Sequence, residues 1–265
     1  MTRKVAALPF DVRPGEVSLN LESVLNGIAQ AAEAGAALLA LPEKWTTSFL
    51  PSYPPEILEA SDRALDTVHE VATDAGLTVV GSAPGKGEVK PTNEIHFLGA
   101  AGNLRPYRKR MMFSPTGEGR GLEAGDSLPE TVPTPVGRVC AFVCYDLRFP
   151  EITRQAFYGD AELIVVPAQW SRPRPEVFEL LARARAAENQ AWVLACNRAG
   201  KADLGDGREF IFPGTALLVN PSGMEDARSE GGELLEGVAA PAAVEKIRRA
   251  IPCARDLKKS GLWPG

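Results

Sequence analysis

Cys144 is the residue of this chain whose position in the sequence best fits a chemically reactive side chain. The preceding residues 138–143 read R-V-C-A-F-V, a short apolar and β-branched run typical of a strand buried on both faces. Charged residues follow at once, and Pro150 with Glu151 predicts the start of a helix. A thiol between a strand end and a helix is lifted out of the sheet, where the positive end of the helix dipole favours the thiolate. The position therefore predicts an activated nucleophile.

A free cysteine also serves as a small buried apolar side chain, and this is the interpretation for Cys140, Cys196 and Cys253. Cys140 lies within the same strand, so alternation directs it to the same face as Cys144. Only Cys144 stands at the end of that strand. Whether it packs or reacts depends on which groups lie beside it.

Two further reactive side chains follow strand-like segments in the same way. Glu43 comes just after the apolar run 36–41, and Lys109 comes at the end of segment 104–108. Ligands bind outside the carboxyl ends of strands in open α/β sheets, so these groups and Cys144 are expected to converge. Taken singly, Glu43 also fits a solvated or helix-capping carboxylate, and Lys109 also fits a surface charge.

Strand-like and helix-like segments alternate along most of the sequence, which predicts an α/β fold. Residues 201–207 are rich in Gly and Asp and are expected to form a mobile loop. No repeat or linker divides the chain, so residues 1–265 are predicted to form a single domain. The expected strands are 5–8, 36–41, 77–82, 94–99, 104–107, 138–143, 162–166, 191–196 and 215–219. The expected helices are 21–32, 59–74, 175–190 and 240–250, followed by an irregular tail with Trp263.

Composition excludes several classes of function. A net charge of −5 leaves no basic surface of the kind that nucleic acid requires. The four cysteines and two histidines lack the spacing of a zinc site, so no metal is expected. The N-terminus lacks the apolar core of a signal peptide, and no run reaches the roughly 18 apolar residues of a membrane span. These features predict a cytoplasmic protein that keeps its thiols reduced.

The three reactive residues, in this order and with this spacing, resemble the Glu-Lys-Cys triad of the nitrilase (carbon–nitrogen hydrolase) superfamily. The matching segments are L-P-E-K-W around Glu43, Y-R-K-R-M-M-F around Lys109 and V-C-Y-D-L-R-F-P-E around Cys144. The resemblance extends over nearly the whole chain. Its further segments are P-A-Q-W at 167–170, A-R-A-R-A-A-E-N-Q at 182–190, C-N-R-A-G at 196–200, F-P-G-T at 212–215 and N-P-S-G at 220–223.

The resemblance implies that Cys144 attacks an amide or nitrile carbon while Glu43 acts as general base and later as acid. Lys109 and the backbone N–H of Tyr145 would stabilise the oxyanion. Glu118, in T-G-E-G-R-G, matches the family's second glutamate, which orients the lysine and the substrate; the alternative is a loop carboxylate. Met111 departs from the family's histidine at that place. The implied chemistry needs no cofactor.

The post-nucleophile segments are most similar to the ω-amidase-like branch, whose members hydrolyse small dicarboxylic monoamides such as 2-oxoglutaramate or succinamate. Such an anionic substrate needs a basic group in the pocket. The candidates are Arg172, Arg174 and Arg198. Tyr145, Gln169 and Trp170 lie close behind the nucleophile in sequence and are expected to line the pocket, although Trp170 fits the core equally well.

Other functions remain open at this point. The runner-up enzymes are an N-carbamoyl-amine or N-carbamoyl-amino-acid hydrolase and a deaminated-glutathione amidase. A nitrilase proper is disfavoured because Tyr145 and Asp146 replace its expected W-E pair. A binding or regulatory member of the fold would be expected to lose a triad residue. A peroxide-sensing thiol protein would need Cys144 but neither Glu43 nor Lys109.

The resemblance also implies the architecture, a four-layer α-β-β-α sandwich with mixed sheets. Members of the family commonly form homodimers. The interface would then contain the helices near 149–158 and 175–190, and the C-terminal tail would reach the partner.

Overall fold

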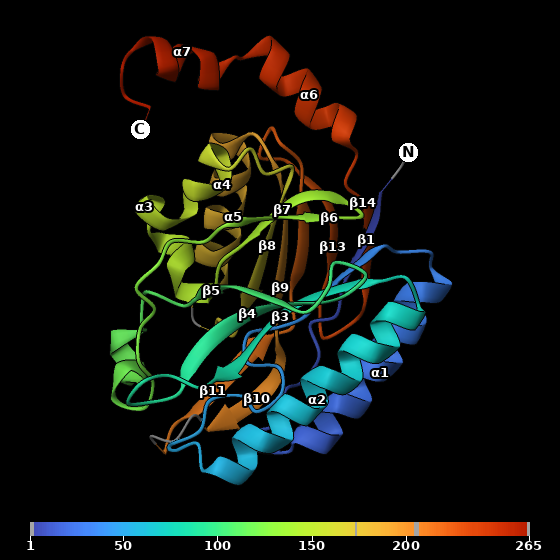
Figure 1. The fold of residues 1–265 in the computed structure, drawn as a ribbon, viewed down its shortest axis with the longest axis vertical. Helices are drawn as coiled ribbons and strands as arrows, with labels where there is room; N and C mark the ends of the chain where they lie inside the picture. Colours follow the sequence, from blue (N-terminus) through green and yellow to red (C-terminus); the bar gives the residue numbers. More distant parts are fainter. Residues whose placement is uncertain (1–2, 173, 204–206, 264–265) are drawn as a thin grey trace.

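Two six-stranded sheets lie face to face, and helices cover the outer face of each (Figure 1). The computed structural model describes residues 3–172, 174–203 and 207–263. Its layers follow one another as α-β-β-α, and both sheets contain parallel and antiparallel pairs. The predicted four-layer architecture is therefore confirmed.

The first sheet has the strand order β14-β1-β2-β3-β4-β5. Its middle strands β1, β2 and β3 pair in parallel, and the outer pairs are antiparallel. The strands are β1 Lys4–Ala7, β2 Leu38–Ala40, β3 Thr78–Gly85, β4 Thr92–Gly99, β5 Leu104–Arg108 and β14 Leu235–Val238. Helices α1 (Val17–Glu33) and α2 (Pro55–Asp74) pack on this sheet because each carries apolar residues at helical spacing on one side.

The second sheet has the order β13-β12-β9-β8-β7-β6. Its parallel strands β7, β8 and β9 lie inside the sheet; β8 and β9 are fully buried, and the last three residues of β7 are buried too. The strands are β6 Thr131–Thr134, β7 Gly137–Ala141, β8 Leu163–Ala168, β9 Trp192–Asn197, β12 Ala216–Val219 and β13 Glu225–Ser229. The outer helices are α3 Pro150–Thr153, α4 Gln155–Tyr158 and α5 Pro175–Asn189.

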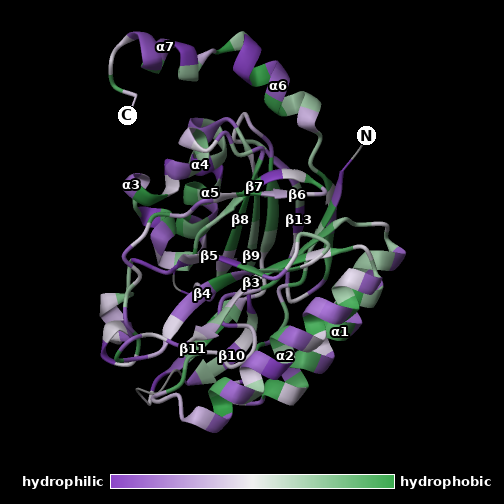
Figure 2. Cartoon of the chain, viewed as in Figure 1, coloured by the Kyte–Doolittle hydropathy of each residue, from purple (hydrophilic) through white to green (hydrophobic). Residues whose placement is uncertain are grey.

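The core between the sheets is built by alternation along the strands. Val5 and Ala7 of β1 point into the layer between the sheets, whereas Ala6 points under the helices. Figure 2 shows the strands as the hydrophobic centre of the molecule and α1 and α2 with mixed surfaces. Apolar packing thus brings the strand ends of both sheets to one place.

Several elements differ from the sequence-based expectation. Part of the predicted loop 201–207 is a hairpin of β10 (Ala199–Asp203) and β11 (Glu209–Pro213), and residues 204–206 of that loop lie outside the described chain. The tail is also not wholly irregular, since α7 (Cys253–Lys259) follows α6 (Pro241–Ala250). Strands β6 and β13 escaped prediction because one contains a proline and the other is polar.

No helix in the described part of the chain is both long and apolar enough to cross a membrane.

Candidate active site

The predicted residues converge from both sheets. Glu43 follows β2 and Lys109 follows β5 in the first sheet, while Cys144 and Gln169 follow β7 and β8 in the second. All four line one cavity of about 860 Å³. The expectation that strand ends would gather these groups is therefore confirmed.

Glu43 is completely buried, and both of its carboxylate oxygens are hydrogen bonded. Oε1 accepts from Lys109 Nζ at 2.8 Å and from Asn93 Nδ2 at 2.9 Å. Oε2 accepts from the backbone N–H of Gln169 at 3.1 Å. A carboxylate held by this many donors has a fixed orientation, as a general base requires.

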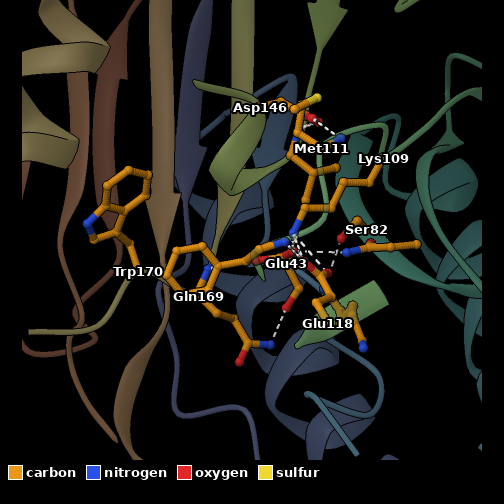
Figure 3. Close-up of polar contacts among 12 residues, drawn as sticks. Glu43, Ser82, Lys109, Met111, Glu118, Asp146, Gln169 and Trp170 are labelled. Atoms are coloured by element: carbon orange, nitrogen blue, oxygen red, sulfur yellow. Dashed lines mark hydrogen bonds and ion pairs between the residues drawn. The ribbon is translucent and has the colours of Figure 1, made fainter. Parts of the chain in front are cut away.

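Lys109 lies between two carboxylates. Its Nζ donates to Glu43 and to both oxygens of Glu118, at 2.9 and 2.8 Å, and Figure 3 shows the three side chains pointing toward one another. Burial opposes the charge of Lys109, but Glu118 and Glu43 outweigh it and raise the pKa of Lys109 well above its usual value. The amine is therefore charged at neutral pH.

Glu118 belongs to the short 3-10 helix Glu118–Arg120 and is buried. Its Oε2 also accepts from the backbone N–H of Phe113 at 2.7 Å. Burial alone would raise the pKa of Glu118, but the charge and hydrogen bonds of Lys109 prevail and lower it. The structure thus brings Glu118 to the lysine and leaves no support for the alternative of a free loop carboxylate.

Cys144 sits on a sharp backbone turn. Strand β7 ends at Ala141, and Cys144 begins a 3-10 helix (Cys144–Arg148) with a φ of 47°. A non-glycine residue in the left-handed region is strained, and such residues cluster at functional sites. The turn places the thiol in the cavity that Glu43 and Gln169 also line, near enough to Glu43 for its charge to act on the sulfur.

The surroundings of Cys144 oppose the predicted thiolate. Burial, followed by the charge of Glu43, raises the pKa of Cys144 well above its usual value, although Lys109 opposes the shift. The helix that follows is a single 3-10 turn, so it offers little dipole to offset this burial. Cys144 therefore rests as a thiol beside a carboxylate that can accept its proton.

The three predicted pocket residues behind the nucleophile all line the cavity. Tyr145 packs edge-on between the rings of Phe113 and Phe149. Gln169 is occupied with Glu43, because its Nε2 donates to the Glu43 carbonyl oxygen at 2.6 Å. Only 9% of the Trp170 surface is exposed, so this residue belongs both to the core and to the cavity wall.

The three candidate arginines have different positions. Arg172 and Arg174 are exposed and line the cavity. Arg198 is absent from the cavity wall and fully buried behind it, where it donates to Gln169 Oε1 at 3.0 Å and to Asp11 Oδ1 at 2.8 Å. Arg198 is therefore a support for Gln169, and the expectation that it could meet the substrate directly is wrong.

Sequence reasoning missed two residues that support the site. Asn93 of β4 donates to Glu43, but nothing in its local sequence marks it. Asp146 accepts hydrogen bonds from the Tyr107 hydroxyl at 3.0 Å and from the backbone N–H groups of Met111 and Val143 at 2.9 and 3.1 Å. The only feature of the sequence that could have indicated a role for Asp146 was its position two residues after Cys144. Asp146 thereby ties the nucleophile turn to the segment that follows Lys109.

Within the described residues, no group of three or more His, Cys, Asp or Glu side chains is arranged to hold a metal ion.

Comparison with known proteins assigns the family. Residues 4–229 match the carbon-nitrogen hydrolase family. The chain is 29% identical to the omega-amidase YafV of Escherichia coli K12 over 86% of its own length and 87% of that protein. It is 28% identical to the 2-oxoglutaramate amidase of Bacillus subtilis, over 96% and 97% of the two chains.

Solved structures agree with this assignment. A variant of the amidase from Nesterenkonia sp. AN1 matches with a TM-score of 0.79 and 27% identity, over 96% of each chain. In that structure the acetamide moiety of fluoroacetamide is covalently attached to the active-site cysteine. The protein described here belongs to the carbon–nitrogen hydrolase (nitrilase) superfamily, is similar to omega-amidases of that family, and is an amidase.

Proposed function

We propose that this amidase hydrolyses a small dicarboxylic monoamide, such as 2-oxoglutaramate or succinamate, to ammonia and a dicarboxylate. The charge of the cavity carries the proposal, because its described lining includes seven basic side chains and two acidic ones. The basic residues are Lys44, Lys109, Arg120, Arg148, Arg172, Arg174 and Arg208. A substrate with a carboxylate at the end remote from its amide is attracted into such a cavity.

The two acidic groups, Glu43 and Glu118, do not cancel this attraction, since both are ion-paired with Lys109. Arg172 and Arg174 line the cavity and are exposed to solvent, so their charges can attract an anion from solution. The printed names of the E. coli and B. subtilis relatives, an omega-amidase and a 2-oxoglutaramate amidase, support the same substrate class.

Formation of the thioester is the first half of the proposed reaction. The Cys144 sulfur attacks the amide carbon while Glu43 accepts the thiol proton. The carbonyl oxygen gains negative charge, which Lys109 and the backbone N–H of Tyr145 stabilise; each such donor contributes about 3–4 kcal/mol in comparable sites. The C–N bond then breaks, Glu43 returns its proton to the nitrogen, and ammonia leaves.

Hydrolysis of the thioester completes the cycle. Glu43 takes a proton from water, the resulting hydroxide attacks the thioester carbon, and the C–S bond breaks. The proton returns to sulfur, so Cys144 is again a thiol, and the acyl group leaves as a carboxylic acid that ionises by giving its proton to the released ammonia. Glu118 keeps Lys109 charged and in place throughout both halves.

The test follows ammonia release from succinamate, 2-oxoglutaramate, N-carbamoyl amines and simple nitriles, and release of cysteinylglycine from deaminated glutathione, each assayed beside Cys144→Ala. Release from the dicarboxylic monoamides, lost in the variant by at least about a thousandfold, is expected for a nucleophile. Activity confined to carbamoyl compounds would refute the substrate class. Full activity in Cys144→Ala would refute the thioester.

We also infer a homodimer formed through α3, α4 and α5. Leu180 of α5 supports this, because 64% of this apolar side chain is exposed in the single chain. Light scattering after gel filtration is expected to give twice the mass of one chain, and Leu180→Glu is expected to weaken the dimer. A monomeric wild-type protein at micromolar concentration would contradict the inference.

A further inference from the structure

Lys44 is a second buried lysine in the cavity, and the mechanism above does not use it. It directly follows Glu43, with a φ of 46°, and its backbone N–H donates to Ser82 Oγ at 2.9 Å. Its side chain is fully buried and lines the same cavity as Cys144. Its Nζ has no hydrogen-bond partner among the residues that the structure describes.

Aromatic rings form the immediate surroundings of this amine. Nζ of Lys44 lies 4.1 Å from the centroid of the Phe49 ring and 4.4 Å from that of Tyr53. The Phe49 ring also lies 5.8 Å from Lys109 Nζ, so the two lysines flank one ring. Phe49 and Tyr53 line the cavity as well. Lys44 is thus placed at the cavity wall, beside the reacting groups and apart from their hydrogen bonds.

An ammonium group in this position lacks a direct counterion. Glu43 and Glu118 attract it electrostatically, but their nearest cation is Lys109, at 2.8 Å from each. Ring faces stabilise a cation less than a hydrogen-bonded carboxylate does. Burial accordingly lowers the pKa of Lys44 to about 7, against the pull of Glu118 and Glu43. A buried polar group without a partner is costly, and an anion entering the cavity would remove that cost.

We propose that Lys44 is a specificity-determining residue that binds the carboxylate of the substrate, at the end opposite the amide that Cys144 attacks. The inference rests on the proposed function and deepens it, because it assigns the recognition of the anion to one buried amine. The exposed arginines would attract the substrate, and Lys44 would distinguish a carboxylate from a neutral group. Binding would pair the ammonium with the anion and keep it protonated.

The first test compares succinamate with its neutral diamide, succinamide, in wild type and Lys44→Met. Methionine keeps an unbranched stem and removes the charge. The ratio of kcat/KM for succinamate to that for succinamide is expected to fall about tenfold or more, mainly through KM for succinamate, as for loss of a charge-assisted hydrogen bond. Lys44→Arg should restore part of the ratio. Equal losses on both substrates would indicate a structural role and overturn the proposal.

The control is Lys246→Met, the same change on an exposed helix residue outside this cavity. It is expected to leave the substrate ratio unchanged. A ratio that falls equally in Lys246→Met would attribute the effect to general surface charge and would also overturn the proposal.

The second test needs no turnover. Calorimetry would measure the binding of succinate to Cys144→Ala and to the double variant with Lys44→Met, in two buffers of different ionisation enthalpy at pH 8. We expect tighter binding and proton uptake only when Lys44 is present. Equal affinity and equal proton uptake would overturn the proposal. If wild type releases no ammonia from any amide while succinate binding still depends on Lys44, the proposed function fails and this inference stands.

Discussion

Gln169 contacts Glu43 at two points, donating from its backbone N–H to Oε2 and from its Nε2 to the carbonyl oxygen. The two residues are 126 positions apart and follow strands of different sheets. The Gln169 amide oxygen is itself held by Ser48 Oγ at 3.1 Å and by Arg198. The orientation of Glu43 therefore depends on a chain of contacts that begins behind the cavity.

Gln169→Ala tests this dependence, because it removes the side-chain contact and keeps the backbone N–H. We expect kcat to fall by about tenfold to hundredfold with a smaller change in KM, since a small misplacement of a catalytic group has this effect. Gln155→Ala, which removes a partly exposed glutamine of α4, is expected to leave kcat unchanged. An unchanged kcat in Gln169→Ala would show that the backbone contact alone positions Glu43.

Glu118→Gln tests the second partner of Lys109. The amide keeps the shape of the side chain and removes its charge, so the pKa of Lys109 falls. We expect kcat to drop by about tenfold to hundredfold, and the alkaline limb of its pH profile to move to lower pH because Lys109 then loses its proton sooner. A lower kcat without a shift of the alkaline limb would mean that Glu118 positions Lys109 but does not control its protonation.

The protonation of Lys44 predicts a pH dependence of substrate binding. Its pKa in the free protein is about 7, so the charged amine is present below this pH and is lost above it. KM for succinamate should therefore rise above pH 7, by about tenfold per pH unit at the limit, because each binding event must first restore one proton. The groups that act on Lys44 are Glu118, Glu43 and Lys109.

Steady-state kinetics between pH 6 and 9 would check this prediction. Succinamide, which has no charge to pair, should show no such rise, and Lys44→Met should abolish the rise for succinamate. A KM for succinamate that stays flat across this range would refute the prediction.

Arg198→Met should destabilise the protein. The guanidinium is fully buried, and its loss would remove the donor to Ser48 Oγ and one of the two donors to Gln169 Oε1. We expect the free energy of unfolding in urea to fall by about 1–3 kcal/mol, as for buried polar groups that lose a hydrogen-bond donor. Asp11→Asn should lower it by only about 0–1 kcal/mol, because the Asp11 side chain is 50% exposed. The reverse order of the two losses would contradict this account.

The positions of Glu43, Lys109 and Cys144 could be predicted because each follows a strand-like segment, and ligands bind at the carboxyl ends of such strands. The resting state of Cys144 could not, because it depends on how deeply the two sheets bury the thiol together. The partnership of Asn93 with Glu43 depends on the position of β4 in its sheet, which no local pattern encodes.

Arg198 is a further residue whose role could not be predicted from the sequence. An arginine beside a conspicuous strand end fits a substrate-binding group and a buried support equally well. The difference lies in Asp11, which is 187 positions away and pairs with it. The α/β layers follow from alternating periodicity, whereas the β10–β11 hairpin required pairing between two segments with weak local signals.

The division of the site between the sheets has a mechanical consequence. Apolar contacts fill the space between the sheets, and such contacts are not directional, so they resist separation better than sliding. The hydrogen bonds from Gln169 to Glu43 are directional and join one sheet to the other. Gln169 and Glu43 thus also fix the alignment of the two sheets. Any sliding of one sheet against the other would displace Glu43 and lower the turnover rate.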